Sequence, residues 1–293
     1  MYYIVFAIFY LLSLLPWRVI YLLSDFFYVL VYYVFKYRRK IVRGNIKIAF
    51  PEKTEAEITR IEKDFYKAFC DNFTEIIKFI SVSKEEIARR FKGEPEKINE
   101  LIEQGYKVQV HSGHFFSWEF CNMGYSPNIR HPFLTVYMQI ENKVFERLFL
   151  YIRERFGTKM LAAGEFKTAF APYRKQNYCL VLIADQNPPH ASVGFWTEFF
   201  GQKIPFPKGP EKGAQFNNTA ILMANMVRVK RGYYSSELKL LTTDPRSMPE
   251  GEITKQMVRF IEETIRKNPS NYLWSHRRFK WKYNEEEHGK YSI

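Results

Sequence analysis

The chain has 293 residues, a formal net charge of +13 and an aromatic content of 18%. This length allows a sizeable core in one catalytic domain with an appendage, and three scattered cysteines (Cys70, Cys121 and Cys179) exclude a disulfide framework or a zinc knuckle. The basic charge leaves nucleic acid, anionic membrane and acidic protein open as partners, and the many aromatic residues favour a membrane interface.

The first 35 residues are predicted to form a hydrophobic membrane anchor. Residues 1–15 carry no charged side chain, and beyond Pro16 a second apolar stretch, interrupted by Asp25, continues to Phe35. The first run alone is short for a bilayer span, but residues 1–35 together are long enough. Neither the basic n-region nor the small-residue cleavage site of a signal peptide is evident. One span and a pair of interfacial helices both fit this pattern.

A basic flank follows the anchor and indicates which side of the membrane the rest of the chain occupies. It consists of Lys36, Arg38, Arg39, Lys40 and Arg43. By the positive-inside tendency, this flank and everything after it are expected in the cytoplasm. We expect residues 36–104 to be a basic and helical segment and residues 105–293 an α/β core, the two together forming one compact domain.

Helical patterns dominate the segment after the flank. Thr54 and Glu57 fit a capping box, and the apolar residues that follow recur at helical spacing. They predict one long amphipathic helix over residues 55–80, preceded by a short apolar link at 45–51. Further helix is predicted over residues 83–104.

Strands and helices alternate from residue 106 onward. Strands are predicted at 106–111, 131–138, 159–162, 178–185 and 234–241, and helices after residue 114 and at 143–157, 165–176, 219–226 and 253–269. This order predicts an α/β fold with a mixed, mainly parallel sheet flanked by helices. Functional groups in such folds gather at the carboxyl ends of the strands.

His114 and Glu119 lie five residues apart in the segment HFFSWE, directly after a predicted strand. A loop that turns into a helix between them can bring the carboxylate to one ring nitrogen, which fixes the tautomer and lets the other nitrogen accept a proton. This pair is the base half of a triad without a protein nucleophile, and it would activate a substrate hydroxyl to attack an acyl carbonyl. The spacing alone favours the alternative, a hydrogen-bonded structural histidine. Asp185 also follows a strand and is expected to face the same crevice.

Longer motifs add a resemblance to this pattern. HSGHFFSWE, with ADQNP further on, resembles the lipid A late acyltransferases, the lauroyl/myristoyl family of Gram-negative bacteria within the lysophospholipid acyltransferase-like superfamily. The resemblance runs nearly end to end, through NIKIAFP at 45–51, RERFGTKML, PEKGAQFNNTAILMA and the C-terminal NYLWSHRRFKWKYN. Because this last motif is long and specific, the chain is identified as a member of that family.

The resemblance implies a glycerolipid-acyltransferase-like fold and transfer of a fatty acyl chain from acyl carrier protein to a hydroxyl of a lipid A precursor. It implies that His114 is the general base, with Glu119 as its orienting partner, and that Arg153, Asp185 and Gln186 bind substrate. No metal or organic cofactor is implied, and the place of action is the cytoplasmic face of the bacterial inner membrane. A thioester donor is already activated, so a base, an oxyanion stabiliser and positioning suffice. A basic surface would attract both an acidic carrier protein and anionic lipid.

Two departures from the family pattern leave the acceptor open. Met138 stands where the family commonly has an arginine after the second strand, and Asn187 stands where it has a second aspartate after the third. A different hydroxylated lipid, such as an aminolipid, is therefore an alternative acceptor, and a non-catalytic basic membrane scaffold is a third hypothesis. Acyl chain length and oligomeric state are not encoded in any pattern that we recognise.

Several other residues have two interpretations. His111 and His114 could bind a metal, but no third ligand cluster accompanies them. Ser112 does not form the G-x-S-x-G of a hydrolase elbow, and no nucleic-acid motif is present, so nucleic acid is not an expected partner. The C-terminal cations either grip a phosphate or the acyl carrier, or form a solvated tail: Arg277, Arg278, Lys280 and Lys282.

Overall fold

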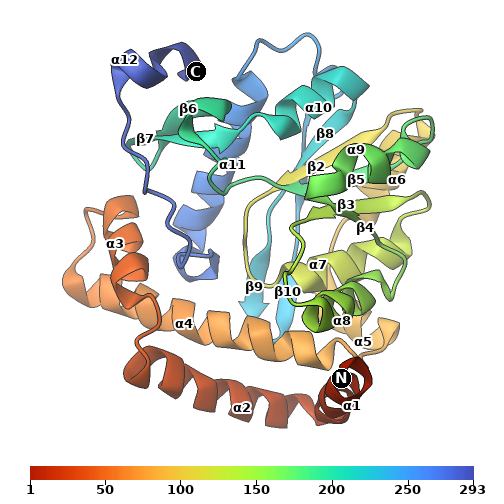
Figure 1. Cartoon of the computed structure of the whole chain (residues 1–293), viewed down its shortest axis with the longest axis vertical. Coiled ribbons are helices and arrows are strands. Elements are labelled where there is room, and N and C mark those ends of the chain that lie inside the picture. Colours follow the sequence, from red (N-terminus) through yellow and green to blue (C-terminus); the bar gives the residue numbers. More distant parts are fainter.

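A six-stranded sheet organises the centre of the computed structural model, which describes residues 1–293 (Figure 1). Its strand order is β11-β8-β2-β5-β3-β4, with β2 (Val108–Ser112), β3 (Phe133–Tyr137), β4 (Lys159–Ala162), β5 (Cys179–Ile183), β8 (Ala220–Ala224) and β11 (Leu238–Thr242). β8, β2, β5, β3 and β4 pair in parallel, and β11 alone runs antiparallel to its neighbour. This is the mixed α/β arrangement expected from the sequence.

The chain begins with four helices: α1 (Tyr2–Ser13), α2 (Trp17–Val29), α3 (Arg39–Ala49) and α4 (Glu55–Lys78). In Figure 1, α1, α2 and α4 lie at the bottom of the molecule, and α3 stands above the left part of α4. A π-helical turn over Leu30–Val34 continues α2. The segment Trp17–Val34 is long and apolar enough to cross a membrane by length and composition, and 17% of it is buried. Both α1 and α2 pack along α4.

The long amphipathic helix predicted over residues 55–80 is confirmed as α4. Thr54 and Glu57 make the expected capping box, in which each side chain bonds to the backbone amide of the other residue. The apolar link predicted at 45–51 is wrong, because α3 continues to Ala49. Buried Val42, Asn45, Ile46 and Ala49 place one face of α3 against the core at the spacing of a helix.

The further helix predicted over residues 83–104, in SKEEIARRF and then EKINELIEQG, is confirmed as α5 (Lys84–Arg90) and α6 (Pro95–Glu103). Between these two helices lies a short strand that was not predicted, β1 (Phe91–Lys92). β1 pairs with β10 (Tyr233–Ser235), which in turn pairs with β9 (Val227–Lys230) in a second, three-stranded sheet. A strand of two residues is too short to show alternating apolar and polar residues in the sequence. Only its pairing with β10 identifies it as a strand.

The rest of the chain surrounds the main sheet. Its elements are α7 (Trp118–Tyr125), α8 (Lys143–Glu154), α9 (Phe166–Phe170), α10 (Gly209–Asn217), α11 (Glu252–Lys267), α12 (Glu285–His288) and the hairpin of β6 (Gly194–Phe199) and β7 (Gln202–Pro207). The prediction of a helix at 219–226 is wrong, because residues 220–224 form β8. Every residue of β8 is buried between β2 and β11, so the strand shows no alternation, and a buried strand of this kind cannot be told from a buried helix by period.

One hydrophobic core joins the N-terminal helices to the sheet. Ile46 of α3 and Phe65 of α4 belong to the same buried cluster as Val110 of β2, Leu222 of β8 and Ile261 of α11. Because α3 and α4 share this core, they hold the edge of the sheet at which β2 and β5 end.

Candidate active site

Two neighbouring parallel strands bring His114 and Asp185 together. His114 lies two residues beyond the end of β2, and Asp185 lies two residues beyond the end of β5. The two strands pair in register from Val108 with Cys179 to the ends of both strands. The Nδ1 atom of His114 consequently lies 2.5 Å from Oδ1 of Asp185. This agrees with the expectation that both side chains face one crevice.

Glu119 does not contact His114, which differs from the expected pairing. It lies in the first turn of α7, its side chain is 1% exposed, and its Oε1 accepts a hydrogen bond from Nη2 of Arg153 at 2.9 Å. Five residues of separation do place Glu119 after a loop-to-helix turn, but α7 directs it toward the end of α8. The carboxylate at the histidine ring comes instead from the adjacent strand, a contact that local spacing cannot show.

Arg153 belongs to the site and is not a surface residue of its helix. It is in the last turn of α8, and its side chain is 18% exposed. Asn122 of α7 donates a hydrogen bond to the carbonyl of Arg153 at 2.9 Å, and Thr158 donates one to the side chain of Asn122 at 2.9 Å. The α7–α8 contact is therefore fixed by a polar bridge beside the Glu119–Arg153 ion pair.

The C-terminal segment holds the loop that carries the histidine. The amide of Leu273 donates to the carbonyl of His114 at 3.1 Å, and the amide of Phe116 donates to the carbonyl of Asn271 at 3.0 Å. Asn271 is itself buried and donates from its side chain to the carbonyl of Met226 at 2.7 Å. The segment 271–273 thus acts as a backbone partner for residues 114–116.

The NIKIAFP motif supports that same C-terminal segment. Asn45 of α3 is buried, and its side-chain amide donates to the carbonyls of Trp274 at 2.8 Å and His276 at 2.7 Å. Arg38 donates to the carbonyl of Ser275 at 3.1 Å. Two motifs that are more than two hundred residues apart in sequence are therefore parts of one support for the His114 loop.

Burial and neighbouring charges shift the acid–base groups around His114. Burial acts to raise the pKa of Asp185, but the opposing charge and hydrogen bonds of His114, and next the neighbouring Tyr272 hydroxyl, hold it at about 2. Burial, and next the charge of Asp185, raise the pKa of Tyr272. Burial, and next the charge of Arg278, lower the pKa of His276 to about 4. Asp185 is therefore a carboxylate over the physiological range, with a neutral phenol and a neutral imidazole near it.

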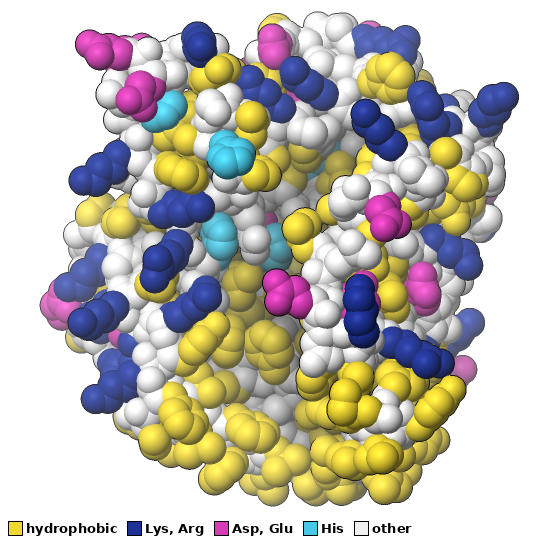
Figure 2. Space-filling model, in the orientation of Figure 1, with side chains coloured by type: hydrophobic (Ala, Val, Ile, Leu, Met, Phe, Trp, Pro, Cys, Tyr) yellow, Lys and Arg dark blue, Asp and Glu magenta, His cyan; other side chains and the backbone are white.

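A cavity of about 550 Å³ opens beside these groups, and 20 of its 32 lining residues are hydrophobic. It is lined by His114 and Glu119 and extends along the sheet and α7 to Ile98 of α6 and Leu238 of β11. Figure 2 shows histidine side chains beside a hollow in the middle of this face. The second oxygens of Glu119 and Asp185 are buried and have no hydrogen-bond partner. The site therefore combines an apolar space with polar atoms whose hydrogen-bonding capacity is not fully used.

The remaining predicted positions divide between the cavity and its support. Gln186 lines the cavity, and so does Met138, whose side chain is 78% exposed. Asn187 accepts a hydrogen bond from Arg278 at 2.5 Å, and Arg278 also donates to the carbonyl of Pro205 at 3.0 Å. Because Arg278 is fully buried, neither interpretation of the C-terminal cations, phosphate grip or solvated tail, holds for it.

Four residues near the site were not singled out as functional by the sequence. Trp118 lines the cavity with its ring centroid 5.9 Å from that of His114. Asn122, Thr158 and Tyr272 act through neighbours that only the folded chain supplies, so no local signal identifies them. His111 is buried, faces away from the cavity lining and has no hydrogen-bond partner on either ring nitrogen. The chain has no cluster of three or more His, Cys, Asp or Glu side chains that could hold a metal ion.

Comparison with known proteins agrees with the motifs. A family model described as bacterial lipid A biosynthesis acyltransferase matches residues 1–281. The chain is 22% identical over 248 residues to the lipid A biosynthesis palmitoleoyltransferase of Escherichia coli K12, which covers 84% of this chain and 79% of the relative. A lipid A biosynthesis acyltransferase of Shigella flexneri matches with the same identity and coverage.

Proposed function

Because the chain belongs to the bacterial lipid A biosynthesis acyltransferase family, we propose that it transfers a fatty acyl chain from acyl carrier protein to a hydroxyl of a membrane lipid, and that this lipid is a lipid A precursor. The observation that carries the proposal is the contact between His114 and Asp185 at a largely apolar cavity. We infer further that the core has the glycerolipid-acyltransferase-like fold.

In this proposal His114 is the general base. Asp185 accepts a hydrogen bond from Nδ1–H, which fixes the tautomer that leaves Nε2 with a free lone pair. Nε2 takes the proton of the acceptor hydroxyl while the oxygen attacks the thioester carbonyl. Collapse of the tetrahedral intermediate forms the ester and expels the carrier thiolate, which receives the proton from the imidazolium. Asp185 replaces Glu119 as the orienting residue because it is the carboxylate in contact with the ring.

We assign Glu119 and Arg153 to binding the reacting carbonyl. Glu119 fixes the guanidinium through one nitrogen at 2.9 Å, and both residues line the cavity, so the remaining N–H groups of Arg153 are assigned to the carbonyl oxygen. A donor that is positioned before the reaction stabilises the charge that develops on the carbonyl oxygen. Gln186, on the loop after β5, is assigned to substrate contact at the same edge.

The apolar part of the cavity is assigned to the acyl chain. Val110, Phe133, Tyr125, Ile98 and Leu238 supply its walls. Each methylene that leaves water contributes about 0.8 kcal/mol, so the length of the apolar space selects the chain length. The donor protein is proposed to dock through charge, because acyl carrier proteins are acidic and this chain carries +13.

The acceptor lipid is assigned from the family to which the chain belongs, and one alternative acceptor remains. Met138 places an uncharged side chain at the cavity, where a phosphorylated headgroup would favour a cation. The side-chain oxygen of Asn187 already accepts a hydrogen bond from Arg278. An aminolipid with a free hydroxyl is the alternative. The site of action is proposed to be the cytoplasmic face of the inner membrane, because the basic residues from Lys36 onward follow the apolar segment.

The test uses the purified full chain with an acyl carrier thioester, a lipid A precursor and a hydroxylated aminolipid in separate reactions, with products measured by mass spectrometry. We expect the precursor to gain the mass of one acyl group. Acylation of the aminolipid alone would contradict the choice of acceptor. Transfer to neither acceptor, by a chain whose folding is shown by circular dichroism, would contradict the activity itself.

A further inference from the structure

The first 35 residues present a continuous apolar surface to solvent. The large hydrophobic side chains exposed there include Tyr3, Ile4, Ile8, Leu11, Leu14, Leu22, Phe26, Phe27, Val34 and Phe35. Phe6 and Phe9 of α1 contact Tyr151 and Phe145 of α8, at 5.1 Å and 6.4 Å between ring centroids, so the surface extends onto the catalytic domain. Figure 2 shows hydrophobic side chains gathered over the part of this face where α1 and α2 lie in Figure 1.

On the opposite side of the same segment, polar contacts fasten it to α4. Lys78 donates to the carbonyls of Ser13 at 2.7 Å and Leu15 at 2.8 Å, which satisfies the carboxyl end of α1. Ser24 of α2 is buried and donates to Asp71 at 2.6 Å. These contacts hold α1 and α2 lengthwise against the domain.

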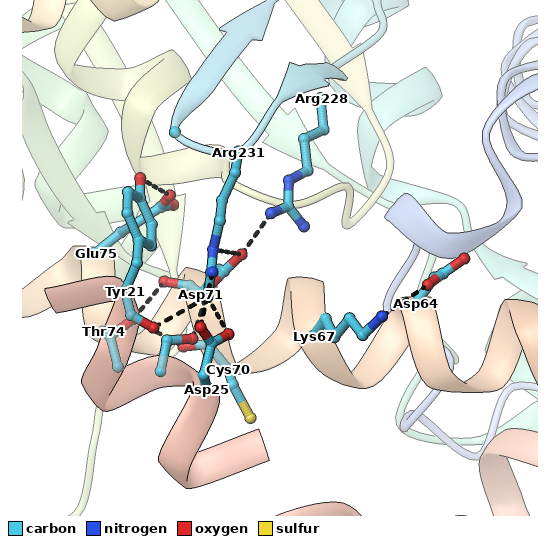
Figure 3. A network of polar contacts seen from close by, with 12 residues as sticks. Tyr21, Asp25, Asp64, Lys67, Cys70, Asp71, Thr74, Glu75, Arg228 and Arg231 are labelled. Atoms are coloured by element: carbon cyan, nitrogen blue, oxygen red, sulfur yellow. Dashed lines mark hydrogen bonds and ion pairs between the residues drawn. The ribbon is translucent and has the colours of Figure 1, made fainter. Parts of the chain in front are cut away.

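A basic residue in the turn between β9 and β10 completes the attachment (Figure 3). Arg231 donates to Asp25 at 2.6 Å, to Asp71 at 2.7 Å and to the carbonyl of Tyr21 at 3.1 Å. Asp25 is the one acidic residue in the first 35, and here it is neutralised by an ion pair. The single carboxylate of the segment, 54% exposed, is thus held by an arginine of the domain, while many of the large hydrophobic side chains of the segment are exposed to solvent.

A transmembrane position of α2 would break this arrangement. The 18 residues from Trp17 to Val34 span about 27 Å as a helix, which matches a bilayer. However, Asp25 would then lie near the middle of the membrane, where a charged side chain is unfavourable, and buried Asp71 would lose the hydrogen bond from Ser24. α1 has 12 residues, or about 18 Å, and is too short to cross in its place.

We propose that residues 1–35 do not cross the membrane, but lie in its plane, and that their exposed apolar side enters one leaflet of a bilayer that contains anionic lipid. Exposed Arg18, Lys36, Arg38 and Lys40 lie on this segment and directly after it. Near a negatively charged surface each such cation strengthens binding. The partner is thus a lipid surface, recognised by apolar insertion together with positive charge.

The topology is tested by placing a short protease-cleavable tag before Met1 of the full chain, and in a second protein after Ile293. Protease is added to spheroplasts and to inverted inner-membrane vesicles. We expect both tags to be cleaved only in the inverted vesicles. Cleavage of the N-terminal tag in spheroplasts, while the C-terminal tag stays protected, would mean that α2 spans the membrane and would overturn the proposal.

The insertion is tested with vesicles of phosphatidylethanolamine and phosphatidylglycerol and two matched variants. Phe26→Asp changes a side chain of α2 that is 58% exposed, whereas Leu240→Asp changes one of β11 that is 49% exposed. We expect Phe26→Asp to weaken vesicle binding at least tenfold while Leu240→Asp binds like the original chain, with both variants melting at the same temperature. Equal binding of the two variants, or equal binding to vesicles of phosphatidylcholine alone, would contradict the proposal.

Discussion

Two groups of buried carboxylates in this molecule use their oxygens differently. At the cavity, Asp185 and Glu119 each have one partner, His114 and Arg153, and each keeps one buried oxygen without a hydrogen bond. Between α2, α4 and the β9–β10 turn, Asp71 receives hydrogen bonds from Ser24, Arg228 and Arg231 on both oxygens (Figure 3). Glu75, one helical turn further along α4, receives two tyrosine hydroxyls.

This difference distinguishes a binding site from a structural contact, and we call the contact around Asp71 and Glu75 the joint. A buried polar atom without a partner costs free energy, so its persistence beside a cavity indicates that a ligand is to supply the missing bond. A carboxylate whose two oxygens both accept hydrogen bonds from the protein has no free acceptor for a ligand. It stabilises the packing of the elements that it connects. Substitutions at the cavity should therefore change turnover, and substitutions at the joint should change stability.

The largest expected effect is on turnover, from His114→Ala. General base catalysis contributes roughly 10²–10⁴-fold, so we expect kcat to fall by that factor in a chain that still folds, with a lower melting temperature because buried Asp185 loses its partner. Steady-state acyl transfer and thermal unfolding measure the two quantities. His131→Ala, at a histidine two residues before β3 that does not line the cavity, is the control and should retain full activity. Equal rates for the two variants would remove His114 from the chemistry.

The next effect is on stability, from Asp71→Asn at the joint. Loss of the charge leaves Arg228 and Arg231 without their buried carboxylate. Because both guanidiniums reach solvent, we expect a loss of about 3 kcal/mol, at the lower limit for breaking a buried pair. Urea unfolding measures it. Asp64→Asn, on the same helix in an exposed pair with Lys67 at 3.5 Å, is the control and should change stability by less than about 1 kcal/mol.

If Asp71→Asn instead lowered kcat in the folded protein while leaving stability unchanged, the joint would belong to the site and the comparison would fail. Activity should therefore be measured per folded molecule, at a temperature well below the unfolding transition of the variant.

The sequence predicted the sheet and the location of the site better than it predicted the contacts between the residues of the site. The strand ends at Ser112 and Ile183 placed His114 and Asp185 at one edge, since parallel neighbours share that edge. The pairing of His114 with Glu119 followed from local spacing, whereas strand order, a long-range property, brought Asp185 to the ring. For the same reason nothing in the sequence could pair Asn45 with the C-terminal segment or Arg231 with Asp25.

A smaller effect on turnover is expected from Asp185→Asn, which sharpens the assignment of the orienting carboxylate. An amide at this position no longer fixes the Nδ1–H tautomer, and we expect kcat to fall roughly 10²-fold. Nitrogen NMR of the histidine ring should show a changed tautomer for His114 in Asp185→Asn and an unchanged one in Glu119→Gln. A tautomer change in Glu119→Gln alone would restore Glu119 as the orienting residue.

The smallest effect is a pH dependence of stability from Glu75. Burial, and next the charge of Asp71, raise its pKa to about 7 from an ordinary value of 4.5, against hydrogen bonds from Tyr21 and Tyr234. The folded chain therefore keeps a proton on Glu75 at pH values where the unfolded chain has released it, and stability falls as the pH rises from about 4.5 to 7.

Between pH 5 and pH 7 this difference amounts to about 2 kcal/mol. Urea unfolding at both pH values should show the loss in the original chain and in Glu100→Gln, an exposed control on α6, but not in Glu75→Gln, which cannot ionise. The rate of acyl transfer, measured in the same range on folded protein, should follow the same pH profile in Glu75→Gln as in the original chain, because Glu75 is saturated by tyrosines and does not line the cavity. A pH profile of turnover that moved with this substitution would show that the joint and the cavity titrate together, and the separation drawn between them would have to be abandoned.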